Sequence, residues 1–185
     1  MRFAAFYRNV NLGRPNCPGK SQLEQAFLEA GASEAASFLV NGTIAFEARN
    51  LAAARKVLAG ASALMAGECG LKEPGFLREL AALRELVESD PFRDVDASSV
   101  YGCCVTFLDA KADLRRLPAG LPGGEVDVIR AAGGEVMCVA RQLPHKKSAG
   151  SPNAFIEKAL GLPATTRIWN TVVRLVAKHS DSGGG

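Results

Sequence analysis

The sequence predicts an α+β protein of two small domains, each built of antiparallel strands with helices packed on one sheet face. Short apolar runs typical of strands alternate along the chain with longer segments of helical periodicity. The dipeptides Asn41-Gly42 and Gly133-Gly134 stand between paired apolar runs, where they favour hairpins and therefore antiparallel pairing. A chain of 185 residues is long enough for one large domain or two small ones, and we expect two.

The first strand and the first helix are predicted near the start of the chain. Residues 2–8, RFAAFYR, form a short apolar and aromatic run that precedes an Asn-, Gly- and Pro-rich segment, as is typical of a strand. A helix is expected over residues 21–30, where apolar side chains recur on one helical face. Ser21 is its expected N-cap, and Glu24 three residues later would complete a capping box.

A hairpin, a second helix and an edge strand are expected next. Residues 37–46 are two apolar runs around Asn41-Gly42, and this dipeptide favours a type I′ turn. Asn50 is expected to cap a helix that ends near Met65. Residues 67–77 predict a weak, bent edge strand because they contain Gly and Pro. The resulting order, βαββαβ over residues 1–78, is that of a ferredoxin-like (α-β plait) domain.

A connecting helix leads from the first half to the second. It is expected to begin at Phe76 or Leu77 and to end at Glu88, since Asp90-Pro91 disfavours further helix. The next elements are expected at residues 100–108 (strand), 110–117 (helix), 125–130 and 135–141 (strands) and 152–160 (helix, ended by Gly161).

The last predicted helix is capped by Thr165 or Thr166 and ends at Lys178. The second half is therefore expected to be a βαββα unit, and a second plait without detectable sequence repetition. With the connecting helix it forms a domain over residues 79–180. The tail of residues 181–185 has no apolar anchor and is expected to be disordered.

The composition predicts an ordinary globular protein. Hydrophobic residues make up 48% and charged residues 22% of the chain, which excludes a largely disordered protein. No apolar run approaches the ~20 residues of a membrane-spanning helix, so no membrane partner is expected, and a cytoplasmic location follows. The five cysteines are odd in number and match no CxxC spacing, which indicates reduced thiols. Neither a metal nor a cofactor is predicted.

The segment GRPNCPGKS at residues 13–21 is similar in position to a phosphate-binding P-loop. It has one residue too many between the first Gly and Gly-Lys-Ser, and Pro18 has no N–H to offer a phosphate, so nucleotide hydrolysis is not predicted. The start of the helix, with Lys20 and Ser21, could still hold an anion. The alternative is a capped helix start with a solvated lysine.

The C-terminal part of the chain carries a basic segment. Residues 141–180 contain seven Lys and Arg residues against Glu157 alone, a balance of +6 on a chain of net charge +3. Within it, residues 165–171 combine hydroxyl, guanidinium, indole and amide groups. Trp169 could stack on a base and Arg167 could bind a phosphate, or the same residues could begin a helix with Trp169 in the core.

Other polar residues give weaker indications. Arg8 and Asn11 follow the first strand, where loop residues can converge on a ligand, although Asn11 could instead bond its own turn. The two histidines, His145 and His179, have no carboxylate or cysteine at ligand spacing and are expected to be exposed.

Residues 153–172, NAFIEKALGLPATTRIWNTV, resemble the C-terminal motif of the bacterial domain-of-unknown-function family 1697, whose members carry TNAFIEK, LG, P and ATTRNWNTV. YRNVNLG at residues 7–13 is similar to the family's LRGINVGG, residues 38–46 take the place of YIQSGNVVF, and residues 90–92 that of NPF. The order and spacing cover essentially the whole chain. The resemblance implies paired α-β plaits and no established activity.

The resemblance also implies candidate ligand-binding residues, which are Arg8, Asn11, Arg167, Trp169, Asn170 and Thr171. Three places depart from the family pattern: Asn9 stands for a Gly, Ile168 for a polar residue, and residues 40–43 for QSGN.

Three functions are compatible with these observations. The first is a binding module for a phosphate-bearing ligand or nucleic acid that uses the basic C-terminal segment. The second is a small-molecule enzyme with a site between the two plaits, lined by Arg8, Asn11, Arg167 and Asn170. The third is a structural or protein-interaction domain without a ligand, in which residues 165–171 stabilise the fold.

Overall fold

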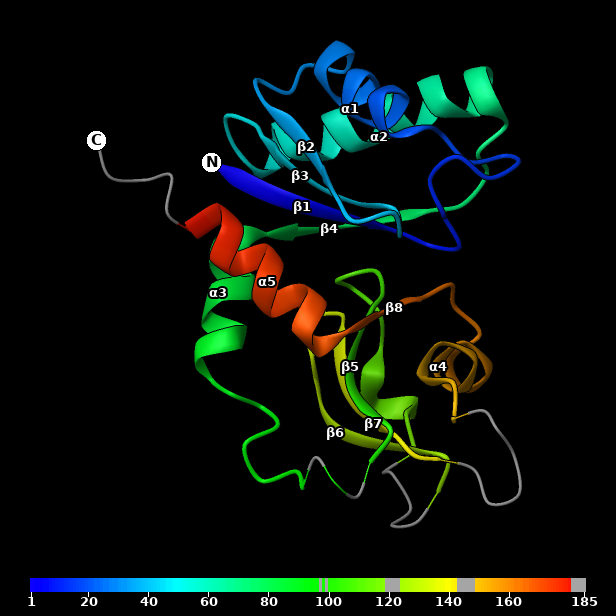
Figure 1. Ribbon diagram of the computed structural model, residues 1–185, viewed down its shortest axis with the longest axis vertical. Helices are drawn as coiled ribbons and strands as arrows, with labels where there is room; N and C mark the ends of the chain where they lie inside the picture. The colour runs from blue at the N-terminus through cyan, green and yellow to red at the C-terminus, as the bar shows by residue number, and fades with distance from the viewer. Residues whose placement is uncertain (97, 99, 119–123, 143–148, 181–185) are drawn as a thin grey trace. The chain divides into compact units, whose positions relative to one another are not determined.

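The computed structural model describes residues 1–96, 98, 100–118, 124–142 and 149–180 (Figure 1). The chain divides into two compact units. The first comprises Met1–Glu85 together with the described residues from Lys178 onward, and the second comprises Leu86–Ala177.

The first unit contains one antiparallel sheet and the helices that follow its strands. Its elements in chain order are β1 (Arg2–Tyr7), α1 (Lys20–Glu29), β2 (Ala35–Phe38), β3 (Thr43–Glu47), α2 (Leu51–Cys69), β4 (Gly75–Glu79) and the start of α3 (Leu80–Glu88). The strand order in the sheet is β2-β3-β1-β4. The predicted order of strands and helices in the first half is therefore confirmed.

The core of the first unit lies between one sheet face and the helices α1 and α2 (Figure 1). Because side chains alternate along a strand, Phe3, Ala5 and Tyr7 of β1 point into this core. The ring of Phe27 on α1 meets Phe46 with 4.9 Å between centroids and Tyr7 with 6.3 Å. The Tyr7 hydroxyl lies 2.8 Å from that of Ser62, and burial raises its pKa. Such burial of aromatic surface explains why a short first strand is so apolar.

The start of α1 differs from the prediction. The N-cap is Gly19 and not Ser21, and Gln22 accepts a 2.7 Å hydrogen bond from the Gly19 N–H. Glu24, the predicted capping partner, instead accepts two hydrogen bonds from Ser37. One comes from the Ser37 N–H at 2.9 Å and the other from the Ser37 hydroxyl at 2.7 Å. A tertiary contact therefore takes the carboxylate that the local pattern assigned to the cap.

The predicted hairpin is confirmed, but its turn is not of the predicted type. β2 pairs with β3 from Ala35 opposite Phe46 to Phe38 opposite Thr43, which leaves a connection of residues 39–42. Positive φ angles occur at Leu39 (60°) and Gly42 (69°) but not at Asn41. A type I′ turn would need positive φ at Asn41 as well as at Gly42.

The second helix begins as predicted and ends later. Asn50 accepts a 2.9 Å hydrogen bond from the N–H of Ala53, and α2 continues to Cys69, where Gly70 ends it with a φ of 73°. The connecting helix begins later than predicted, at Leu80, because residues 75–79 pair with β1 as an edge strand. Pairing with a neighbouring strand thus overrides the helical pattern there.

The second unit contains a sheet of the same strand order. Its elements are β5 (Gly102–Phe107), the 3₁₀ turn η2 (Leu114–Arg116), β6 (Val126–Ala132), β7 (Glu135–Ala140), α4 (Pro152–Leu160), β8 (Thr165–Ile168) and α5 (Trp169–Ser180), of which the last residues group with the first unit. The sheet order β6-β7-β5-β8 matches β2-β3-β1-β4 element by element. The helix α4 packs Ile156 and Leu160 against Val136 and Cys138 of the sheet.

Two predictions for the second half are wrong. The helix expected over residues 110–117 is only the short 3₁₀ turn η2, held at its start by Asp113, which accepts from the Arg115 N–H. Thr165 and Thr166 do not cap a helix but lie in the strand β8, and α5 begins directly after it at Trp169. The other strands of this half and the helix ended by Gly161 are confirmed.

Candidate functional site

The first part of the C-terminal motif is an edge strand held by its threonines. β8 pairs with β5, with Thr166 opposite Thr106, and the two hydroxyl oxygens lie 2.7 Å apart. The β-branched residues Thr165, Thr166 and Ile168 favour an extended backbone. Thr165 and Arg167 are buried while Ile168 is 65% exposed, as expected for side chains that alternate across a strand.

Arg167 is buried and bonded within its own strand. It is 6% exposed, and its Nη1 donates to Thr165 Oγ1 at 2.7 Å and to the Thr166 carbonyl at 3.0 Å. Burial lowers the pKa of the guanidinium to about 10 because a charged group loses its hydration there. These contacts indicate that the Arg167 side chain stabilises the fold.

An equivalent arginine occurs in the first unit. Arg78 is 7% exposed, lies next to the end of the edge strand β4, and donates from Nη1 to the preceding carbonyl, that of Leu77, at 2.7 Å. In both units the strand passes directly into a helix, α3 after β4 and α5 after β8. A position that is shared by two copies of the same arrangement indicates a role in the fold.

The remaining motif residues lie at the start of α5. The Trp169 ring is half-buried and meets the buried ring of Phe92 edge-on, with 5.3 Å between centroids and 65° between planes. Asn170 is exposed and Thr171 is half-buried. Since Trp169 packs against Phe92, part of its surface is committed to the core of the second unit.

Arg8 and Asn11 belong to the first unit. Arg8 Nη1 lies 2.7 Å from Glu73 Oε2 in a half-buried ion pair, and Asn9 Nδ2 lies 3.4 Å from the other oxygen of Glu73. Asn11 is exposed, and its carbonyl accepts from the Arg14 N–H at 3.1 Å within the turn. The structure thus brings Arg8, but not the side chain of Asn11, to a specific polar partner.

A pocket of about 330 Å³ lies beside this ion pair, where the β1–α1 loop meets the α2–β4 loop. We call it the loop pocket, and it is lined by Asn9, Pro15, Asn16, Cys17, Gly70, Leu71, Lys72 and Glu73. Sequence reasoning did not find Asn16, Lys72 or Glu73, because no periodic pattern or motif links the two loops. The signal available was indirect: asparagine tolerates the left-handed conformation that Asn9 and Asn16 adopt, with φ of 50° and 57°.

The left-handed φ of Asn9 also explains a departure from the family pattern. The family motif that residues 7–13 resemble has glycine at this place, and glycine adopts positive φ without a steric penalty. Asparagine is among the residues that occupy this region most readily after glycine. The substitution therefore keeps the loop conformation and adds an amide to the loop pocket.

Lys20 and Ser21 are exposed in the first turn of α1 and do not line the loop pocket. In the loop before them, the Gly13 N–H bonds the Pro18 carbonyl and the Cys17 N–H bonds the Arg14 carbonyl, both at 3.0 Å. These N–H groups are used within the loop and are not presented to a phosphate as in a P-loop.

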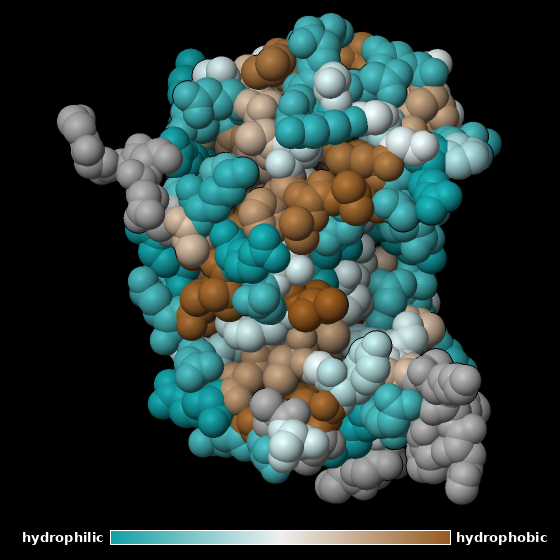
Figure 2. All heavy atoms as spheres, in the orientation of Figure 1, coloured by the Kyte–Doolittle hydropathy of each residue, from teal (hydrophilic) through white to brown (hydrophobic). Residues whose placement is uncertain are grey.

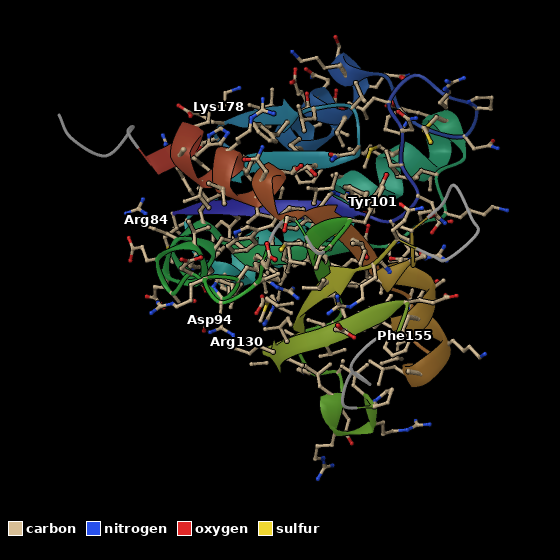
Figure 3. The ribbon with its side chains drawn as sticks, turned by 60° about the horizontal axis from the view of Figure 1, so that its bottom comes forward. Arg84, Asp94, Tyr101, Arg130, Phe155 and Lys178 are labelled. Carbon is tan, nitrogen blue, oxygen red and sulfur yellow. The ribbon has the colours of Figure 1, made fainter. Side chains whose placement is uncertain are left out.

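The basic segment is partly used within the fold. Arg141 forms a 2.6 Å ion pair with Asp127, and Arg167 is buried. Lys178, labelled in Figure 3, places its Nζ 5.8 Å from the centroid of the Phe38 ring. Lys158 and Arg174 are exposed. His145 and its neighbours Lys146 and Lys147 lie outside the described residues.

His179 is not exposed as predicted. It is half-buried, and its Nε2 is buried without a hydrogen-bond partner among the described residues. Burial lowers its pKa, as do the charges of Lys178 and Arg2, so the ring is neutral at pH 7. It lines a second pocket of about 380 Å³, which includes residues of α1, β2 and β3. The position follows from tertiary packing of the α5 end, which no local pattern predicts.

Metal ligands and thiols are the other chemical groups to consider in the described part of the chain. No group of three or more His, Cys, Asp or Glu side chains there could hold a metal ion. All five cysteines are free thiols. Burial raises the pKa of Cys104 to about 11 and of Cys138 to about 12, which disfavours the reactive thiolate. No described helix is long and apolar enough to cross a membrane.

The described fold is that of an α+β protein with two four-stranded antiparallel sheets. The model of the family described as Protein of unknown function (DUF1697) matches residues 1–162, and the chain belongs to this family. A solved structure, that of the conserved bacterial protein SP0830 from Streptococcus pneumoniae, is similar with a TM-score of 0.69. The two chains are 15% identical over 98% of this chain and 99% of that one, which shows a shared fold. No curated protein matches.

Proposed function

We propose that this protein is a binding module of two ferredoxin-like domains, over residues 1–78 and 79–180, that holds a phosphate-bearing small molecule in the loop pocket. The element order βαββαβ and the strand order β2-β3-β1-β4 support the ferredoxin-like assignment of the first domain. The five free thiols support a reducing compartment such as the cytoplasm.

The charge of the loop pocket is the observation that carries the proposed ligand. The carboxylate of Glu73 is the acidic group of the pocket, and it is already neutralised by Arg8 at 2.7 Å. The exposed ammonium of Lys72 makes no hydrogen bond or ion pair with the described residues. With Glu73 neutralised, the pocket presents one positive charge and the Asn16 amide, while Asn9 Nδ2 lies 3.4 Å from Glu73 Oε1. Lysine and amide N–H groups are suitable partners for phosphate oxygens.

Binding is favoured over catalysis by the same lining. The pocket contains the Cys17 thiol but no histidine, and its carboxylate is ion-paired. A thiol nucleophile needs a base or a lowered pKa to react at neutral pH. The residues of the pocket are therefore suited to hold a ligand, and their one carboxylate is engaged by Arg8.

The C-terminal motif has a different role in this proposal. Arg167, Thr166 and Trp169 bond or pack within the second unit. We assign residues 165–171 to stabilising the fold, as in the third function considered from the sequence. Of the candidate ligand-binding residues, Arg8 keeps a direct part, because it neutralises the pocket's carboxylate.

Replacing Lys72 with alanine is expected to weaken phosphate binding by about tenfold, the loss of one charge-assisted hydrogen bond. Isothermal titration with inorganic phosphate and with a panel of phosphorylated metabolites would measure the change. Lys56→Ala is the matched control, because Lys56 is exposed on α2 and does not line the pocket. Equal affinities for Lys72→Ala and the original protein would overturn the proposal.

Titration with a mixed-sequence oligonucleotide tests the alternative site. Binding that falls steeply with salt and survives Lys72→Ala would instead favour the exposed cations of the C-terminal segment, such as Lys158 and Arg174. Charge removal at those two positions should then lower the affinity and the salt slope together. In the proposed function, neither substitution alters phosphate binding.

A further inference from the structure

The open edge of the first sheet is formed by β2, whose backbone groups alternate in direction. The Glu47 N–H donates to the Glu34 carbonyl at 2.9 Å. Every second residue after Glu34, namely Ala36 and Phe38, therefore directs its backbone N–H and C=O toward β3. In an antiparallel ladder, the N–H and C=O groups of the intervening residues point away from the partner. Ala35 and Ser37 therefore direct their backbone groups outward from the sheet.

One of these outward groups is already occupied. The Ser37 N–H donates to Glu24 of α1 at 2.9 Å. This contact agrees with an outward direction of the Ser37 backbone groups. The outward N–H and C=O of Ala35 and the C=O of Ser37 remain directed along the edge. An added antiparallel strand bonds both the N–H and the C=O of one residue, and both groups of Ala35 face the open edge.

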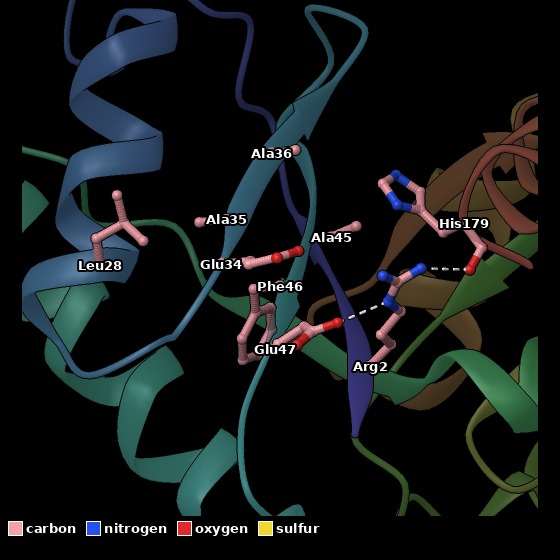
Figure 4. A pocket seen from close by; sticks show the side chains of 9 residues that line it. All are labelled: Arg2, Leu28, Glu34, Ala35, Ala36, Ala45, Phe46, Glu47 and His179. Atoms are coloured by element: carbon pink, nitrogen blue, oxygen red, sulfur yellow. Dashed lines mark hydrogen bonds and ion pairs between the residues drawn. The ribbon is translucent and has the colours of Figure 1, made fainter. Parts of the chain in front are cut away.

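A groove runs beside this part of β2 (Figure 4). It has a volume of about 380 Å³, and its wall at the strand is made by Ala35 and Ala36. Methyl side chains leave the backbone accessible to an incoming chain. Leu28 of α1, 40% exposed, lies on one side of the strand, while Glu34, Arg2 and His179 lie on the other (Figure 4).

The corresponding edge of the second sheet is differently built. β6 occupies the equivalent place and carries an irregularity of register between Val128 and Arg130. A bulge and charged side chains protect an edge against strand addition. Over Ala35–Phe38, β2 carries only Ala, Ser and Phe and pairs with β3 without such a shift. Figure 2 shows hydrophobic residues in several groups among hydrophilic ones.

The charges of the groove decide the chemistry of its occupant. Arg2 Nε lies 2.7 Å from Glu47, so these two charges neutralise each other. The exposed carboxylate of Glu34 makes no hydrogen bond or ion pair with the described residues. The neutral ring of His179 adds no charge, so the groove carries a net negative charge that complements a basic side chain. On the opposite side of the strand, Leu28 offers apolar surface.

We propose that β2 accepts an extended polypeptide segment of alternating aliphatic and basic residues as an additional strand of the first sheet. Successive side chains of such a segment point to opposite faces. Its aliphatic residues lie against Leu28 and its basic residues against Glu34. The main-chain hydrogen bonds to Ala35 provide affinity, and the two faces provide specificity, as in other strand-addition complexes.

The test uses a short capped peptide that alternates valine and lysine, titrated into the full chain and followed by amide NMR and calorimetry. Binding should slow hydrogen exchange of the Ala35 amide. Ala35→Pro removes the outward N–H without removing a bond of the β2–β3 ladder, and it should weaken binding by about tenfold or more. Far-UV circular dichroism and the unchanged amide shifts of α2 would show that the variant is folded.

A charge reversal at Glu34 tests the same interaction without changing the backbone of β2, and it applies even if Ala35→Pro fails to fold. Glu34→Lys should lose the lysine peptide and gain the corresponding valine-glutamate peptide, whereas Glu68→Lys, an equal charge change on the exposed face of α2, should alter neither. Failure of the lysine peptide to bind at millimolar concentration, or equal binding to Ala35→Pro, would overturn the proposal. Self-association abolished by Ala35→Pro would identify a second copy of the chain as the occupant and would likewise overturn it.

Discussion

Arg167→Ala is expected to lower the free energy of unfolding of the second unit by about 3 kcal/mol. The substitution removes a side chain that is 6% exposed and leaves the hydroxyl of Thr165 and the carbonyl of Thr166 without their donor. Urea unfolding followed by the fluorescence of Trp169, the single tryptophan of the chain, would report on this unit.

Two further variants separate packing from charge. Arg167→Met keeps most of the volume and removes a charge whose pKa burial lowers to about 10, so its cost should be about 1 kcal/mol or less. Arg116→Ala is the surface control, since Arg116 is exposed in η2, and should change stability by at most about 0.5 kcal/mol. Unfolding of Arg167→Ala at the original urea midpoint would mean that the motif is not a fold element and would return Arg167 to the candidate ligand residues.

Gly42→Ala is expected to destabilise the first unit by about 3 kcal/mol, for two separate reasons. Gly42 has a φ of 69°, which is unfavourable for alanine. A Cβ there would also lie 2.6 Å from Val10 Cβ and 3.2 Å from Tyr7 Cβ, so the hairpin connection or the first strand would have to shift. Urea unfolding followed by far-UV circular dichroism would measure the loss.

Gly13→Ala is a control that measures only the conformational cost of placing alanine at a positive φ. Gly13 has a φ of 81°, but a Cβ there would have no neighbour within 4 Å. Its replacement should therefore cost about 1 kcal/mol, the conformational penalty alone. If Gly42→Ala were no more destabilising than Gly13→Ala, the close approach of Val10 would not contribute to the stability of the hairpin.

The candidate site shows the limit of local reasoning more clearly than the fold does. Arg8 was identified from its place after the first strand, but its partner Glu73 is 65 residues away. Lys72 and Asn16 lie in two different loops, and only the packing of α1 and α2 on one sheet brings these loops together. The basic segment was found by counting charges, yet a count does not reveal that Arg141 is ion-paired or that Arg167 is buried.

The sequence by itself determined the element order of the first unit, the Asn50 cap of α2, the end of α4 at Gly161 and the family. Each depends on residues close together in the chain or on a contiguous motif, whose physical effect does not require a distant partner. Only the tertiary structure decided that residues 165–168 form a strand and that Glu24 bonds Ser37 rather than capping α1. In each case pairing or packing with a distant residue outweighed a local preference of about 1 kcal/mol.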